Sequence, residues 1–334
     1  MRRREFIATL AGAAWALPQR PFAQTPPQTP KLVRVGILFG GSGSLSNPTY
    51  ASYRDAFLQG LRQRGWEGKK LIIEERATEG RAERFAEYAA ELVASQVDVA
   101  VGTDSQAIQA LKEKTSTIPI VMVGAADPIR SGFIASLARP GGNITGVTNQ
   151  FDEIAGKHFE LLREFKPGIE RVGVLYTPSN SGSAIGMKQF VDNMRKWLGG
   201  PLVPVPIDKA EDIEAAFVAI DQNRLQALNV HPTPVISTNR IRIIALLIER
   251  GLPTTTGSKA MARDGILLSY GPDPVEAWRG AAAYVDRILR GANPAELPVE
   301  RPTKFELTIN MKTAKAVGVT IPPTLLARAD EVIE

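Results

Sequence analysis

The chain has 334 residues, of which 44% are hydrophobic and 22% charged, a composition typical of globular proteins, and its formal net charge is +5 at pH 7. Cysteine is absent, which excludes disulfide bonds and a lipid-bearing cysteine after an export signal. Lys and Arg form no cluster with interleaved aromatic residues, so nucleic acid is excluded as an expected partner.

The first 23 residues have the pattern of an export signal peptide. The arginines Arg2–Arg4 precede an apolar run at Ile7–Leu17, which is too short to span ~30 Å of hydrocarbon. The order RREFI at Arg3–Ile7 resembles a twin-arginine signal, and an ordinary secretory signal with extra arginines is the alternative. Residues 24–30, QTPPQTP, predict a Pro-rich linker. Since no later segment has ~18 consecutive apolar residues, we expect an exported, soluble protein in the periplasm.

The remaining ~310 residues exceed what one hydrophobic core usually serves, so two lobes are expected. In the first half, short β-branched runs alternate with stretches that have apolar residues at helical spacing. This alternation predicts a parallel sheet with helices on both faces. We expect strands at Leu32–Phe39, Leu71–Glu75, Val97–Val101 and Ile118–Val123, and helices at Tyr50–Arg64, Ala82–Ser95 and Ser105–Lys114.

The same pattern starts again in the second half, where RVGVLY at Arg171–Tyr176 resembles RVGILF at Arg34–Phe39. If the chain crosses between the lobes more than once, its last elements are shared between them. Further strands are expected at Leu202–Val205, Ala227–Val230, Leu252–Thr255, Gly265–Tyr270 and Phe305–Asn310, and helices at Ser183–Leu198, Ile213–Asp221, Ile236–Arg250 and Val275–Arg290.

The loop after the first strand, ILFGGSGSLSNP, lies where nucleotide-binding proteins hold a phosphate. The dinucleotide fingerprint requires a third glycine, but Gly41 and Gly43 are followed by Ser46, and no P-loop lysine is present. We therefore expect no nucleotide cofactor. Serine hydroxyls and free amides at a helix start suit a carboxylate or another small anion, and a plain turn is the alternative.

Motifs for catalysis are absent as well. The chain has no cysteine nucleophile, no G-x-S-x-G elbow and no H-E-x-x-H metal motif. Polar groups without a reaction centre predict binding rather than catalysis. We expect a protein that is not an enzyme and that has no metal and no cofactor.

Several polar residues allow two interpretations. His158 is expected on a helix surface, whereas His231 ends a strand and can either line a pocket or have a structural role. Asp127 can pair with a ligand ammonium or cap a turn, and Asn180 can form a turn or bind a ligand. The tryptophans expected to pack rather than line a pocket are Trp66, Trp197 and Trp278.

The run SLARPGGNITGVT at Ser136–Thr148 resembles a signature of the bacterial ABC-transporter substrate-binding family sometimes labelled tryptophan/tyrosine transport-like. Similar matches follow in GKHFELLREFKPGIERVGVLYTPSN, in LLSYGPD and from AAAYVDRILRGANP to the end of the chain. The resemblance implies an α/β, periplasmic-binding-protein-like fold of two doubly wound parallel-sheet lobes, joined by about three hinge crossings, with the ligand between them. The implied division is 31–148 plus 258–291 for lobe one and 149–257 plus 292–334 for lobe two.

The resemblance also implies which residues bind the ligand. Hydroxyls of the lobe-one loops would hold a carboxylate, Asp127 would meet an ammonium group, and Tyr270 would offer a ring. His231 departs from the family pattern, because relatives often carry an acidic residue there, so the family label does not identify the ligand. The implied ligand-binding residues are Ser42, Ser44, Thr103, Ser105, Asp127, Asn180, His231 and Tyr270.

These observations predict the extracytoplasmic solute-binding component of an ABC importer. It would capture a small polar ligand, such as an amino acid or a related small acid, and present it as a monomer to a permease in the inner membrane. Hinge closure over the ligand would be the working motion. The alternatives are a periplasmic ligand sensor for a signalling receptor and, with less support, an enzyme acting on small acids.

Overall fold

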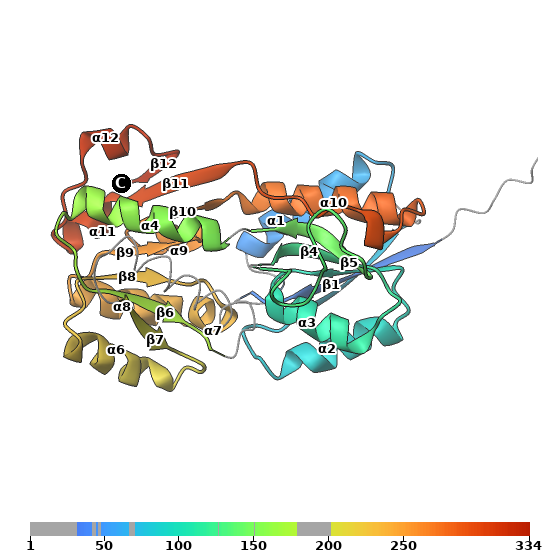
Figure 1. Cartoon of the computed structure of the whole chain (residues 1–334), viewed down its shortest axis with the longest axis horizontal. Coiled ribbons are helices and arrows are strands. Elements are labelled where there is room, and N and C mark those ends of the chain that lie inside the picture. The colour runs from blue at the N-terminus through green and yellow to red at the C-terminus, as the bar shows by residue number, and fades with distance from the viewer. Residues whose placement is uncertain are drawn as a thin grey trace, which may run out of the picture. The chain divides into compact units, whose positions relative to one another are not determined.

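Two sheets, each covered by helices, form the part of the chain that the computed structural model describes (Figure 1). The described residues are 32–41, 45, 48–66, 71–125, 127–149, 151–178 and 202–334, all within the unit Leu32–Glu334. The predicted export signal, linker and helix at 183–198 lie outside them, as do Ser42, Ser44 and Asn180. Among the described helices, none is both long and apolar enough to cross a bilayer.

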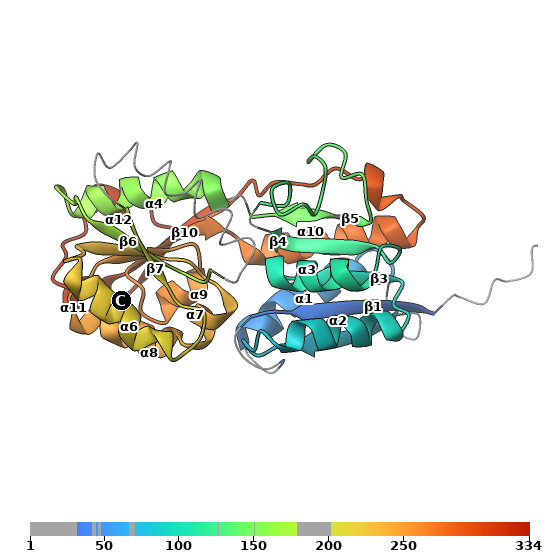
Figure 2. The ribbon, with the colours of Figure 1, turned by 60° about the horizontal axis from the view of Figure 1, so that its bottom comes forward.

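The first sheet, sheet A, is parallel throughout and has the strand order β2-β1-β3-β4-β5. Its central strands are almost entirely apolar because helices cover both faces, and the exception, Arg34, forms an ion pair with Glu74. Helices α1 and α10 cover one face and α2 and α3 the other (Figure 2). The elements are β1 Val33–Phe39, α1 Pro48–Arg62, β2 Leu71–Ala77, α2 Arg84–Ala94, β3 Val99–Gly102, α3 Ser105–Lys114, β4 Ile120–Ala125, β5 Ile144–Thr148 and α10 Pro274–Leu289.

The second sheet, sheet B, has the order β12-β11-β10-β9-β8-β6-β7. Only the β10–β11 pair is antiparallel, among the strands described. The strands are β6 Val172–Tyr176, β7 Leu202–Pro206, β8 Ala227–Val230, β9 Thr254–Thr256, β10 Leu268–Pro272, β11 Phe305–Asn310 and β12 Glu331–Ile333. The helices are α4 Phe151–Phe165, α6 Asp212–Gln222, α7 Pro234–Thr238, α8 Arg240–Glu249, α9 Lys259–Arg263, α11 Met311–Ala316 and α12 Pro323–Leu326.

The chain passes between the two sheets from β5 to α4, from β10 to α10, and from residue 300 to β11. These passages are hydrogen-bonded to one another: Thr148 N donates to Glu300 O (3.0 Å), and Asp273 N donates to Lys304 O (3.3 Å). Within the range 258–291 expected in lobe one, β10 pairs with β9 and β11 of sheet B, whereas α10 packs against α1. Strand pairing therefore places β10 with sheet B, and α9 packs against β9, β10 and β11 of the same sheet.

Two local expectations were wrong. The helix expected at Ile236–Arg250 is divided into α7 and α8 at Asn239, whose backbone leaves the helical region (φ −95°, ψ 11°). His158 was expected on a surface, yet it is fully buried within α4. It faces the sheet because its position on α4 falls on the apolar face that packs against β9 and β10.

Candidate ligand-binding site

The carboxyl ends of parallel strands meet at one edge of a sheet, which is where ligands of open α/β sheets bind. In sheet A this edge carries Thr103 and Ser105 after β3 and Asp127 after β4. In sheet B it carries Thr177 after β6 and His231 and Thr233 after β8.

A compact polar group follows β1 and β3. Gly40 N donates to Thr103 Oγ1 (3.2 Å), while Asp104 caps α3 by accepting from Gln106 N (2.9 Å) and Ala107 N (3.0 Å). Burial raises the pKa of Asp104 to about 6, against the opposing effect of these backbone N–H bonds. Ser105 is the first residue of α3 and is buried.

Replacing Gly40 with alanine is expected to lower the free energy of unfolding by about 1–3 kcal/mol. A Cβ at Gly40 would lie 1.7 Å from Asp104 Oδ2, so the carboxylate would have to leave its capping position. Urea unfolding measures the loss, with Gly142→Ala as the control, because a Cβ at Gly142 has no atom within 4 Å. Equal unfolding midpoints for the two variants would contradict the prediction.

Asp127 serves as a turn residue in the structure. Its Oδ1 accepts from Arg130 N (3.0 Å), and its Oδ2 lies 3.3 Å from Arg130 Nε. The carboxylate thus already has a cationic partner, and a contact with a ligand ammonium stays a prediction.

The sheet B edge is built from hydroxyls and one imidazole. Thr177 Oγ1 and Thr233 Oγ1 are 2.6 Å apart, which joins the loops after β6 and β8, and Thr233 also caps α7. His231 is only 8% exposed, and burial, with a smaller effect of His158, lowers its pKa to about 3. The imidazole is therefore neutral at pH 7, so His231 brings no positive charge to this edge.

The structure places Tyr270 at a different location. Its ring stacks on Phe305, with centroids 5.7 Å apart, and lines a cavity of about 400 Å³ together with Lys157, Arg328 and Asp330. None of Thr103, Ser105, Asp127 and His231 lines this cavity.

His158 organises a buried polar network that the sequence did not indicate. Its Nε2 donates to the Tyr270 carbonyl oxygen (2.5 Å), so the neutral ring must accept at Nδ1. Asn229 Nδ2 donates to that Nδ1 (2.8 Å) and to Thr255 Oγ1 (3.0 Å). Burial lowers the pKa of His158 to about 4, which keeps the ring neutral at pH 7, and the two hydrogen bonds select the tautomer.

A cavity of about 540 Å³ lies along the passages between the sheets. Gly124, Thr148 and Asn149 line it from the ends of β4 and β5, and Asp273 and Lys304 from the other two passages. The sequence signal for this cavity was the stretch SYGPD, which ends in Asp273. The predicted site included only the tyrosine of this stretch, Tyr270.

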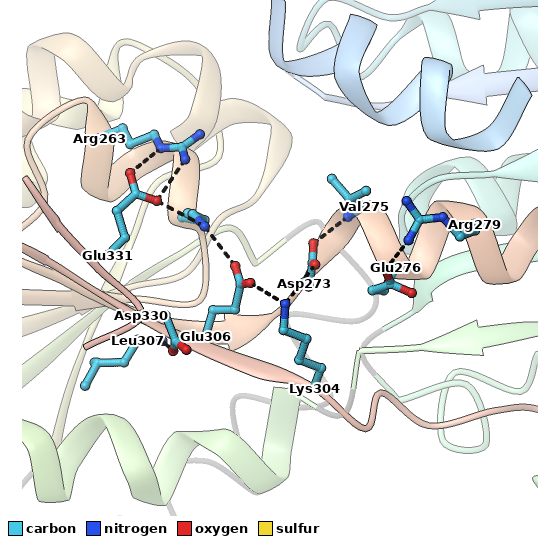
Figure 3. Close-up of polar contacts among 11 residues, drawn as sticks. Arg263, Asp273, Val275, Glu276, Arg279, Lys304, Glu306, Leu307, Asp330 and Glu331 are labelled. Atoms are coloured by element: carbon cyan, nitrogen blue, oxygen red, sulfur yellow. Dashed lines mark hydrogen bonds and ion pairs between the residues drawn. The ribbon is translucent and has the colours of Figure 1, made fainter. Parts of the chain in front are cut away.

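A chain of ion pairs runs from β12, an outermost strand of sheet B, to Lys304 and Asp273, which line this cavity (Figure 3). Glu331 of β12 accepts from Arg263 (2.8 Å for both oxygens) and contacts Lys259 Nζ (3.0 Å). The hydrogen bonds from Arg263 are the main cause that lowers the pKa of Glu331 to about 2.

The chain continues through β11. Glu306 accepts from Lys259 (2.9 Å) and Lys304 (2.8 Å), and Lys304 Nζ lies 3.7 Å from Asp273, which caps α10. Alternating charges thus connect α9 and both C-terminal strands with the start of α10.

Among the described residues, no group of three or more His, Asp or Glu side chains is arranged to hold a metal ion. The described part of the strand edges offers hydroxyls, backbone amides and a neutral imidazole. Groups of this kind hold a small polar molecule by hydrogen bonds.

Comparison with known proteins agrees with this chemistry. A family model described as ABC transporter substrate binding protein matches residues 42–333. A tyrosine-binding protein of Clostridioides difficile (strain R20291) is 23% identical over 282 residues, which are 84% of this chain and 80% of that protein.

Solved structures are similar along nearly the whole chain. A conserved domain protein from Vibrio cholerae O1 biovar El Tor has a TM-score of 0.82 at 26% identity, over 90% of this chain and 100% of that one. An ABC domain from Streptococcus pneumoniae in complex with L-Trp has a TM-score of 0.82 at 25% identity, over 91% and 100%. The family model, the tyrosine-binding relative and the structure with L-Trp all describe binding proteins, so this chain is a binding protein and not an enzyme. It belongs to the ABC transporter substrate-binding protein family.

Proposed function

We propose that the chain is the extracytoplasmic solute-binding component of an ABC importer and that its ligand is an amino acid. The observation that carries the proposal is the family match over residues 42–333. The amino-acid class is supported by a relative named as tyrosine-binding and by a similar structure that holds L-Trp. The protein would act in the periplasm as a monomer and deliver the ligand to an inner-membrane permease.

The strand edges suit the two ends of an amino acid. Thr103 and Ser105, with Ser42 and Ser44, would donate to the carboxylate, and Asp127 would meet the ammonium group in exchange for Arg130. Neutral His231 and the Thr177–Thr233 pair would offer hydrogen bonds without a net charge. Asn180 completes the proposed set, whereas Tyr270, which stacks on Phe305 beside another cavity, is left out of it. The proposed lobes are 31–148 plus 258–291 and 149–257 plus 292–334, except that residues 258–272, with α9 and β10, go with sheet B.

Thermal unfolding of the purified chain with amino acids, sugars and small carboxylates tests the ligand class. L-tyrosine or L-tryptophan at 100 times its Kd is expected to add about 2.7 kcal/mol to the free energy of unfolding and to raise Tm by a few degrees. Thr103→Val is expected to weaken binding about tenfold, the effect of ~1.4 kcal/mol. Thr117→Val is a control, because Thr117 is exposed and lies at the opposite edge of sheet A. It is expected to change the Kd for the ligand by less than about twofold.

A shift with sugars alone, or with nothing in the panel, would contradict the amino-acid ligand. The importer role is tested separately, in cells of the native host that lack the chain. Loss of uptake of the amino acid that binds is the expected result, whereas unchanged uptake would favour a sensor.

A further inference from the structure

Two turns from opposite sheets meet beside the proposed site. Gly80 lies in the turn after β2 of sheet A, and Thr238 is the last residue of α7, which follows β8 of sheet B. A Cβ built on Gly80 would lie 1.9 Å from Thr238 Oγ1 and 2.9 Å from Thr238 Cβ. The backbone of one turn is therefore in direct contact with the side chain of the other.

The turn after β2 is held rigidly. Both Glu79 (φ 54°) and Gly80 (φ 76°) have positive φ, and Arg81 N donates to Thr78 O (3.0 Å). The Glu79 carboxylate accepts from Arg81 (2.7 Å) and Arg84 (2.9 Å), which fixes the turn to the start of α2. Thr78 N in turn donates to the carbonyl oxygen of the residue that ends β1, so this turn moves with the strand edge that carries the proposed site.

The partner helix is held equally well. Thr238 Oγ1 donates to Pro234 O (2.9 Å), and Arg240 donates to Ser237 O (3.1 Å). At the other end of α7, the capping residue Thr233 contacts Thr177. The turn after β2 is thus hydrogen-bonded to the end of β1, next to the proposed site, and α7 begins after a residue of that site.

We propose that Gly80 and Thr238 are positioning residues for ligand capture: their contact sets how closely the two strand edges approach when a ligand is held between them. The inference rests on the proposed function. Any side chain at position 80 would push the two strand edges apart. Its Cβ would lie 1.9 Å from Thr238 Oγ1, and an ordinary van der Waals contact would require the two atoms to move apart by at least about 1.5 Å. Glycine is required here for its positive φ and, independently, for this close approach.

Gly80→Ala is expected to weaken binding of L-tyrosine or L-tryptophan about tenfold in isothermal titration. Gly65→Ala is the matched control, since Gly65 also has positive φ (88°) but nothing within 4 Å of a Cβ, and it should bind like the wild type. Adding Thr238→Gly to Gly80→Ala removes all three side-chain atoms that a Cβ at position 80 would meet and should recover most of the affinity. Wild-type binding by Gly80→Ala, or no recovery in the double variant, would overturn the proposal.

A test without ligand separates this inference from the proposed function. Because the chain has no cysteine, Gly80→Cys with Thr238→Cys introduces one thiol pair, whose Cβ separation of 2.9 Å is within a small shift of disulfide geometry. Mild oxidation should form an intramolecular disulfide, and Gly65→Cys with Thr238→Cys should form none. If the first pair cross-links and the wild type binds no amino acid, the contact stands and the proposed ligand fails. If the first pair does not cross-link, the contact is overturned whatever the chain binds.

Discussion

Trp278→Ala is expected to lower the free energy of unfolding by about 3–5 kcal/mol, the usual cost of deleting a buried tryptophan side chain. The Trp278 side chain is 4% exposed and packs between α10 and α1. Its ring stacks on Tyr53 (6.2 Å) and meets Tyr50 (5.9 Å) and Phe57 (6.1 Å) edge to face. Removing it would open a cavity between the two helices that cover this face of sheet A.

Urea unfolding followed by circular dichroism measures this effect. Trp278→Phe keeps an aromatic ring and should lose clearly less than Trp278→Ala. Trp66→Ala is a second control, because Trp66 is only partly buried and bonds to Asp286 through its indole N–H (2.7 Å). A loss below ~1.5 kcal/mol for Trp278→Ala would show that this aromatic cluster is not part of the cooperative core.

Acidification from pH 7 to pH 4.5 is expected to lower the free energy of unfolding by about 3 kcal/mol. Burial lowers the pKa of His158 to about 4 and of His231 to about 3, whereas an unfolded histidine titrates near ~6.5. Below pH ~6.5 the unfolded chain therefore binds protons that the folded chain does not, and each histidine costs about 2.5 kcal/mol by pH 4.5.

Asp104 acts in the opposite direction. Burial raises the pKa of Asp104 to about 6, so as pH falls the folded chain binds this proton before the unfolded chain does. Between pH 7 and pH 4.5 this raises the free energy of unfolding by about 2 kcal/mol. Urea unfolding at several pH values measures the net loss. His231→Asn should show about half of the histidine-dependent loss, and a wild type with constant or rising stability toward pH 4.5 would contradict the assignment.

Much of the fold follows from local pattern. Apart from Arg34, the β1 run is apolar because both faces of the strand are covered, and its hydrophobicity therefore indicates a central strand. Helix α10 was predicted at Val275–Arg290 and is observed at Pro274–Leu289, since its apolar spacing and its Asp-Pro start are both local signals. The predicted α/β, periplasmic-binding-protein-like architecture is confirmed.

The candidate site was predictable to the level of strand ends. Thr103, Ser105 and His231 follow β3 and β8, as the alternation of strands and helices implies. Their contacts were not predictable, because they involve residues far away in sequence. Thr103 accepts from Gly40 across 63 positions, and Tyr270, also placed at a strand end, instead stacks on Phe305 beside another cavity.

Hydrophobic periodicity and turn residues indicate which side of a segment faces the core and which faces solvent. This was enough to predict the fold class and the residues at the strand ends. They do not report which distant segment fills the other side of a contact. Tertiary packing decided that His158 is buried against Asn229 and Tyr270, because only the placement of α4 over sheet B gives both ring nitrogens a hydrogen-bond partner. It also brought Gly80 against Thr238, a contact between residues that lie 158 positions apart in the sequence.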